Sequence, residues 1–269
     1  MTQNAPLMPL RDRGYNAAEF ERLRLILSTF RDGGGQVILK ATNESMPGFR
    51  DFERSVAAVT GGYTREDKGV FDVLVDTADS PLPYGISCKM TQMRPAEHES
   101  SFMELTNSAA KFAAEFRRLN VSWVHDPAMA GNAMVDLVSS WHDDLADEVD
   151  VPSSAYLVLV HDKPWRNFQL HAFPLTLRHA DPRTDVRWSV RNHRQTGSPS
   201  ALQGTIDDSG RAHTLWELYP NSGGQCKYYP LLSWATWVSP VFELELPPAE
   251  SLFDRAGEYF STAWSAVSP

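Results

Sequence analysis

Two apolar stretches in the first half of the chain each contain a charged residue whose type suits phosphate chemistry. Asp72 lies within Val70–Asp76, and Lys89 follows Ser87 within Tyr84–Met90. A charge inside a strand is costly unless it is paired, and Lys is rarely fully buried without a partner. Hydrolysis of a phosphodiester needs a metal to polarise the phosphate, an activated water and a cation close to both. Asp72 as a metal ligand and Lys89 as the group that orients the water would meet two of these needs.

The order of side chains along the second stretch decides which of them can act together. Side chains alternate along a strand, so Ser87 and Lys89 face one side of the sheet and Cys88 faces the other. Mg²⁺ prefers oxygen ligands and usually takes one or two carboxylates together with substrate and water. Ser87 carries no charge, so we expect the second carboxylate to come from elsewhere in the chain.

The segment 48–119 resembles the PD-(D/E)xK nuclease superfamily, and within it the type II restriction endonucleases. In that family a helix with a Glu precedes a strand with an Asp, a strand ending in (D/E)-x-K, and another helix. The matching positions here are Glu53, Asp72 and Ser87-Cys88-Lys89. The chain departs from the pattern at Ser87, where the family usually has an acid, and at Phe71, which replaces a Pro.

A variation within the family accounts for the missing acid. In restriction enzymes that recognise a CCGG core, a Ser-x-Lys strand is compensated by a Glu on the following helix. Glu104, 15 residues after Lys89, has that position, and Glu97 and Glu99 are alternatives on the connecting loop. The resemblance implies Mg²⁺ as the cofactor, held by Asp72, Glu104 and the carbonyl of Cys88.

The remaining roles are also implied by the resemblance. Lys89 would serve the water and the phosphate, and Glu53 would support the site or bind a second metal. Each residue has a simpler explanation as well. Lys89 could extend its ammonium to the end of the sheet, Glu104 could favour a helix N-terminus, and Glu53 could pair with a neighbouring Arg. Only their joint arrangement favours a nuclease.

The pattern of apolar residues predicts a mixed α/β (α+β) fold. The resemblance implies that its central sheet is restriction-endonuclease-like and flanked by helices. The predicted helices cover 16–30, 48–59, 102–119, 133–145 and 249–264. The predicted strands cover 70–76, 84–90, 155–161, 168–173, 186–190, 214–219, 225–229 and 241–246. We expect one domain over 1–269, with a catalytic core at about 45–175, a β-rich DNA-recognition elaboration at about 180–247, and the closing helix.

Two segments of the β-rich part have residue types that contact DNA. Arg187, Arg191 and Arg194 belong to the most basic short stretch, which also contains Asn192 and precedes a loop at 195–203 that is rich in Ser, Gly and Pro. Gln225 and Lys227 belong to the second segment, 221–229. Arg reads guanine and Asn or Gln reads adenine in the major groove, and all of them contact phosphates. The alternative is a pair of ordinary solvated hairpins.

Two other patterns contain residues used in catalysis elsewhere. Trp141-His142-Asp143-Asp144 contains a His-Asp pair typical of another class of metal hydrolases, but no partner His precedes it at suitable spacing, so a surface helix is predicted. Cys88 lies among apolar neighbours, which favours a buried, inert thiol over a nucleophile.

Composition limits the class of protein. The net charge of −9 argues against a general nucleic-acid coat protein, although a local basic region is enough for a DNA enzyme. No apolar run is long enough for a membrane span, the first residues lack a secretory signal, and two cysteines fit a reducing cytoplasm. We expect double-stranded DNA as the partner and a homodimer or tetramer. The alternatives are a DNA-binding or regulatory protein with a decayed nuclease core, a non-specific repair or defence nuclease, and a protein-interaction module.

Overall fold

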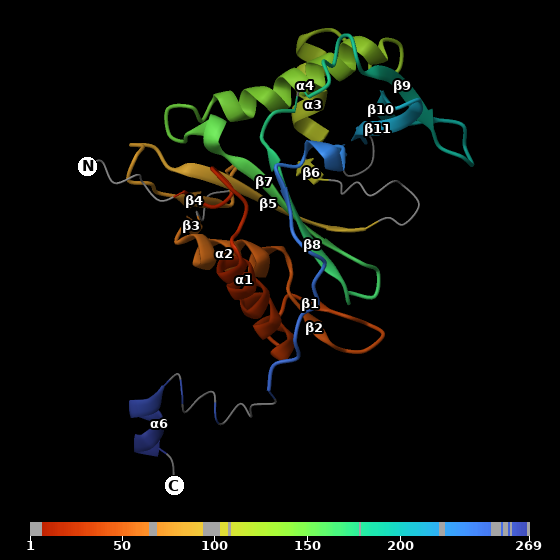
Figure 1. Cartoon of the computed structure of the whole chain (residues 1–269). Coiled ribbons are helices and arrows are strands. Elements are labelled where there is room, and N and C mark those ends of the chain that lie inside the picture. The colour runs from red at the N-terminus through yellow and green to blue at the C-terminus, as the bar shows by residue number, and fades with distance from the viewer. Residues whose placement is uncertain are drawn as a thin grey trace.

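The structure is a computed structural model that describes residues 7–64, 69–93, 103–106, 109–177, 179–220, 224–248, 254, 258 and 260–267. It is a mixed α+β fold (Figure 1). Its helices are α1 (Ala17–Thr29), η1 (Phe30–Asp32), α2 (Phe49–Thr60), α3 (Ala109–Arg118), α4 (Pro127–Asp143), η2 (Val151–Ser153), η3 (Leu232–Trp234) and α6 (Ser261–Val267). Its strands are β1 (Val37–Ile38), β2 (Ser45–Met46), β3 (Tyr63–Thr64), β4 (Val73–Val75), β5 (Tyr84–Gln92), β6 (Met103–Thr106), β7 (Ala155–His161), β8 (Phe168–Pro174), β9 (Arg187–Asn192), β10 (Pro199–Asp208), β11 (Arg211–Leu218), β12 (Cys226–Tyr228) and β13 (Trp237–Val238).

A six-stranded mixed sheet forms the centre of the molecule, in the order β13-β8-β7-β5-β4-β3. β5 and β7 run parallel, with Lys89 opposite Val158, and the other neighbours are antiparallel. The sequence predicted the bounds of β7 correctly, because an almost wholly apolar run is typical of a strand covered on both faces. α1 and α2 lie on one face of this sheet and α3 and α4 on the other (Figure 1).

The alternation of side chains along β7 divides the core into two apolar clusters. Leu157 and Leu159 pack with residues of α1 and α2, whereas Tyr156 and Val158 pack with residues of α3 and α4. Local capping fixes where α1 and α2 begin. The side chain of Asn16, which precedes α1, accepts a hydrogen bond from the backbone N–H of Glu19. At the start of α2, a carboxylate oxygen of Asp51 accepts a hydrogen bond from the backbone N–H of Gly48.

A second, five-stranded antiparallel sheet has the order β6-β12-β11-β10-β9 and packs against α4. The predicted helix at 102–119 is therefore wrong in its first part. Residues Met103–Thr106 form β6, and a helix begins only at Ala109. β6 pairs with β12, and Met103 is fully buried in the cluster beneath. Long-range strand pairing overrides a helical spacing that the local sequence favours.

Two other predictions in the second half are wrong. The predicted loop at 195–203 is ordered strand from Pro199 onward, because β10 pairs on both sides, with β9 and with β11. The predicted strand at 241–246 is absent, and only Phe242 forms an isolated bridge, to Phe168. The closing helix predicted at 249–264 lies mostly outside the described residues, and α6 covers its end.

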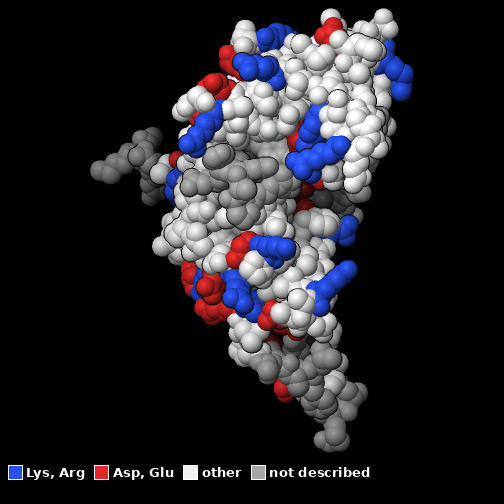
Figure 2. Space-filling view, turned by 90° about the vertical axis from the view of Figure 1, so that its right-hand side faces the viewer, with Lys and Arg blue, Asp and Glu red and all other residues white. Residues whose placement is uncertain are grey.

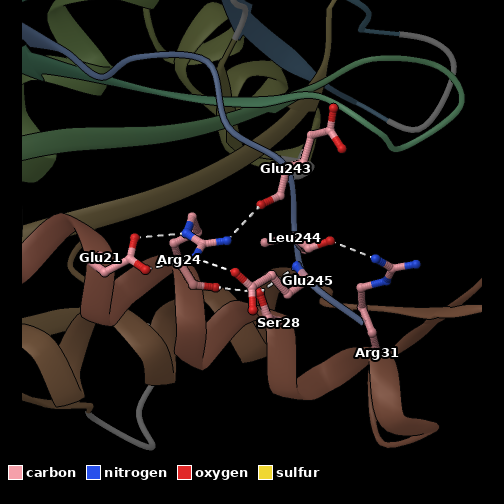
Figure 3. A network of polar contacts seen from close by, with 7 residues as sticks. All are labelled: Glu21, Arg24, Ser28, Arg31, Glu243, Leu244 and Glu245. Atoms are coloured by element: carbon pink, nitrogen blue, oxygen red, sulfur yellow. Dashed lines mark hydrogen bonds and ion pairs between the residues drawn. The ribbon is translucent and has the colours of Figure 1, made fainter. Parts of the chain in front are cut away.

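The segment 243–245 lies along α1 instead of joining a sheet (Figure 3). Arg24 donates to the carbonyl of Glu243, at 3.4 Å, and Arg31 donates to the carbonyl of Leu244, at 2.6 Å. The backbone N–H of Glu245 donates to the Ser28 hydroxyl, at 3.0 Å. Side chains of α1 and η1 thus satisfy backbone groups that a neighbouring strand would otherwise bind.

Among the described residues, no helix is both long and apolar enough to cross a membrane.

Candidate active site

The carboxylate of Asp72 lies at the centre of the candidate site. Asp72 immediately precedes β4, and its backbone N–H donates to the carbonyl of Ile86 on β5, at 3.1 Å. Its Oδ2 accepts hydrogen bonds from the backbone N–H of Cys88, at 2.7 Å, and from the Ser87 hydroxyl, at 3.4 Å. The ammonium of Lys89 lies 3.6 Å from the same oxygen. Three residues of the Ser-x-Lys strand therefore contact one oxygen of Asp72, so the acid faces Ser87 and Lys89 as the sequence predicted.

Glu53 brings a second carboxylate toward this group from α2. It is half-buried, and its pKa is raised to about 7, first by burial and then by the negative charge of Asp72. Lys89 and two arginines of α2 act in the opposite direction on this pKa. Two carboxylates and one ammonium thus lie within electrostatic range of each other. A carboxylic acid that titrates near neutral pH beside another acid is typical of functional sites.

Cys88 contributes backbone but no reactive thiol. Its side chain is buried in the cluster on the α1–α2 side of the sheet. Burial raises the pKa of the thiol well above its ordinary value, and the charge of Asp72 adds to this effect. The thiol therefore stays protonated, which agrees with the prediction of a buried, inert cysteine.

A cavity of about 360 Å³ adjoins Lys89 on the other side of the sheet. Ser87, Lys89 and Tyr156 line it from the sheet, and Lys111 and His142 line it from α3 and α4. The Lys111 ammonium lies 4.7 Å from the centre of the Trp141 ring. Lys111 thus brings a second cation to the wall of the cavity that Lys89 lines.

His142 was predicted to lie on a surface helix, and this prediction is wrong because α4 packs its face onto the core. The side chain is only 7 % exposed, and its Nε2 lies 3.0 Å from the hydroxyl of Tyr156. Burial lowers the pKa of His142, the charge of Asp143 partly opposes this shift, and the charge of Lys89 adds to it. His142 is therefore neutral near neutral pH. Lys111 and Tyr156 line the cavity although the sequence did not single them out as candidates, whereas His142 was noted only for its His-Asp pattern.

Glu104 lies on β6, opposite Lys227 of β12, and not on a helix. Its neighbours Leu105 and Thr106 line the cavity beside Lys89. Within the part of the chain that the structure describes, no three His, Cys, Asp or Glu side chains form a group that could hold a metal ion. Glu104 therefore does not complete such a group with Asp72 and Glu53, and its metal role stays a prediction. Glu97 and Glu99 lie outside the described residues.

The donor set of Asp72 and Glu53 fits Mg²⁺. This ion needs only one or two protein carboxylates, because substrate phosphate and water supply its other oxygens. Burial and then the charge of Asp72 raise the pKa of Glu53, and a bound divalent cation would favour the ionised form of both carboxyl groups.

The predicted DNA-contacting residues lie on or beside β9 and β12 of the second sheet, with Arg187 and Asn192 at opposite ends of β9. Arg187, Arg191 and Asn192 are exposed on β9, and Arg194 lies in the turn that follows. Arg191 is already bound, because it donates to Glu217 at 2.5 Å and to the Tyr219 hydroxyl at 2.9 Å. Arg187, Asn192 and Arg194 are thus better placed than Arg191 to contact a ligand.

The two predicted DNA-contacting segments meet at Tyr219. Its ring lies 5.3 Å from the guanidinium of Arg191 and 5.3 Å from the ammonium of Lys227. The backbone N–H of Tyr219 donates to the carbonyl of Gln225. On the face shown in Figure 2, basic side chains lie in separate groups with acidic ones between them. Any contact with DNA on this face is therefore local.

Comparison with known proteins gives no match. No family model, no curated protein and no solved structure is similar enough to this chain to be matched to it. The class that the structure itself defines is an α+β fold with a mixed central sheet. Function is therefore argued from the geometry of the site.

Proposed function

We propose that this protein is a Mg²⁺-dependent type II endonuclease that hydrolyses phosphodiester bonds of double-stranded DNA at specific sequences. The observation that supports this proposal is the convergence of Glu53, Asp72 and Lys89 at strands β4 and β5. The cavity beside Lys89, with Lys111 on its wall, supports it further. The fold proposed for this site is the restriction-endonuclease core.

Each residue has a distinct task in the proposed reaction. Asp72 and Glu53 would hold the metal ion, which when bound polarises the phosphate and acidifies a water molecule. The backbone N–H of Cys88 and the hydroxyl of Ser87 hold the Asp72 carboxylate in one orientation. Lys89, whose ammonium lies 3.6 Å from Asp72, would orient the attacking water and neutralise the phosphate.

The substrate would be bound by groups outside this centre. Lys111 provides positive charge at the cavity, and the exposed Arg187, Asn192 and Arg194 on or beside β9 would contact the duplex. Because both strands of a palindromic site must be cut, we propose a homodimer with a twofold axis.

Cleavage of plasmid DNA in the presence of Mg²⁺ tests the proposal. Wild type should produce discrete fragments, and Asp72→Asn and Lys89→Ala should each slow cleavage by at least about 100-fold. Asp147→Asn is the matched control, because Asp147 is exposed in the turn after α4. A thermal melt of each variant shows whether it is folded.

The outcomes distinguish the proposal from its alternatives. A smear instead of discrete bands would indicate a non-specific nuclease with the same centre. DNA binding that falls with salt, without cleavage in any divalent metal, would indicate a DNA-binding protein with a decayed core. Cleavage by Asp72→Asn and Lys89→Ala at the wild-type rate would refute the assignment of the site.

A further inference from the structure

A second cavity, of about 570 Å³, lies away from the candidate active site. It is enclosed by η1 and the β1–β2 hairpin, by the turn between β7 and β8, and by the segment 243–244. None of the residues that line it also lines the cavity beside Lys89. Its size is within the range of sites for small organic ligands.

Positive charge dominates the walls of this cavity. Arg31, Lys40, Lys163 and Arg166 line it, against the two acids Glu44 and Glu243. Lys40, Lys163 and Arg166 are exposed and have no ion pair with any residue that the structure describes. In a chain with a net charge of −9, such a local excess of cations favours an anionic ligand.

Arg31 lines the cavity and binds two other residues of its wall. Its guanidinium donates to the carbonyl of Leu244 and lies 3.5 Å from the carboxylate of Glu44. Its buried Nε has no hydrogen-bond partner among the described residues. Figure 3 shows the Glu243 carboxylate pointing away from Arg24, whereas the backbone carbonyl of Glu243 accepts a hydrogen bond from Arg24. Backbone hydrogen bonds from Arg24 and Arg31, together with the ion pair between Arg24 and Glu245, therefore hold this wall of the cavity.

Trp165 lies on the rim in a strained conformation. Its φ of 58° is in the left-handed region, which is unfavourable for a bulky side chain. The turn is held by Asp162, whose carboxylate accepts hydrogen bonds from the backbone N–H of Arg166, at 2.7 Å, and from the Asn167 side chain, at 2.8 Å. The indole stacks on His161 with ring centres 3.6 Å apart. Strain of this kind is retained where the surroundings fix it, and it concentrates at functional sites.

We propose that this cavity binds a nucleoside phosphate, with the phosphate held by Lys40, Lys163 and Arg166 and the base against Trp165. Ammonium and guanidinium groups bind phosphate through charge-assisted hydrogen bonds. An aromatic ring accepts any base, because each base has a π-face. A free mononucleotide and an unpaired nucleotide at the end of a strand share this chemistry. The proposal is independent of the proposed nuclease activity.

Calorimetric titration of the full-length protein in EDTA, where no metal-dependent cleavage occurs, tests this site. The probes are deoxyadenosine 5′-monophosphate, inorganic phosphate, deoxyadenosine, and a short single-stranded oligonucleotide with a 5′-phosphate. The mononucleotide should bind at least about tenfold more tightly than phosphate or the nucleoside, because only it uses both parts of the site. If the oligonucleotide binds more tightly than the mononucleotide, the site takes strand ends. If the mononucleotide binds more tightly, the site takes a free nucleotide. Both results support the proposal.

Substitutions separate the two parts of the site. The double variant K163A/R166A should weaken mononucleotide binding by at least about tenfold. Trp165→Asn keeps a residue that tolerates the left-handed conformation, so it should remove the preference for the mononucleotide over phosphate. Arg22→Ala, an exposed cation on α1, is the control.

Three results would overturn the proposal. These are no binding of any probe by wild type, equal binding by wild type and K163A/R166A, and an equal loss in Arg22→Ala. Unchanged preference for the mononucleotide in a folded Trp165→Asn would remove Trp165 from the site. Because Asp72→Asn leaves this cavity intact, that variant should bind the mononucleotide like wild type even if it cleaves no DNA.

Discussion

The half-buried carboxyl of Glu53 should make the metal-free protein less stable as the pH rises. Its pKa of about 7 in the folded protein compares with an ordinary value of 4.5. For a fully shielded group this difference would correspond to about 3 kcal/mol of unfolding free energy. Because Glu53 is only half-buried, solvent screening reduces the effect to about 1–2 kcal/mol.

The sign of this effect follows from where the proton is bound. Below pH 4.5 the carboxyl is protonated in both states, so it has no effect on the unfolding free energy. Between pH 4.5 and 7 the unfolded chain has lost the proton and the folded protein retains it, so stability falls across this window. Above pH 7 the folded protein contains an ionised Glu53 close to Asp72, and the loss is complete.

Glu53→Gln isolates this contribution. Urea unfolding without divalent metal, followed by tryptophan fluorescence, measures the unfolding free energy of the variant minus that of wild type. This difference should be about 1–2 kcal/mol larger at pH 8 than at pH 4.5. Adding Mg²⁺ at pH 8 should stabilise wild type more than the variant, because only wild type offers two carboxylates. Asp147→Asn serves as the control for general charge effects. A difference between wild type and Glu53→Gln that does not change with pH would refute the assigned pKa and the proximity of the two acids.

Three further substitutions test the packing that supports the site, each by urea unfolding. Leu157→Ala removes a fully buried side chain of β7 and should cost about 2–5 kcal/mol; a loss below this range would mean that the cavity collapses. Gly131→Ala would place a Cβ 2.1 Å from the Trp188 ring, so a loss of about 1–3 kcal/mol is expected, and a neutral result would contradict that close approach. Glu217→Gln leaves the guanidinium of Arg191 without its ionic partner and should cost about 1–3 kcal/mol, whereas an unchanged midpoint would show that solvent replaces the pair.

The sequence was sufficient where the signal is local. Asn16 marks the start of α1, Gly48 the start of α2, and the apolar run Ala155–His161 is β7. Caps and periodicity depend on neighbouring residues, so they can be recognised without the rest of the chain. The same holds for Asp72 and Lys89, because antiparallel pairing of adjacent strands brings residues near one turn together.

The sequence was insufficient where a partner distant in the chain decides the structure. Residues 103–106 become strand because β12, more than 100 residues later, offers an edge. Pro199 begins β10 despite its loop-like neighbours, because two strands flank it. His142 lines the cavity because residues of α4 and β7 share one core, where its Nε2 lies 3.0 Å from the Tyr156 hydroxyl. The residues of each segment show no periodic pattern that would reveal its distant partner.

Ser87, the position at which the chain departs from the family pattern, has a physical role in the structure. It is 1 % exposed, and its hydroxyl donates to Asp72. A carboxylate at this buried position would place a second negative charge beside Asp72 without solvent to screen it. Glu53 instead approaches from α2, where it is half-exposed and can release its proton when a cation binds. Asp72 and Glu53 thus bring two partly exposed carboxylates toward Lys89, so the chain has a pair of acids here without one at position 87.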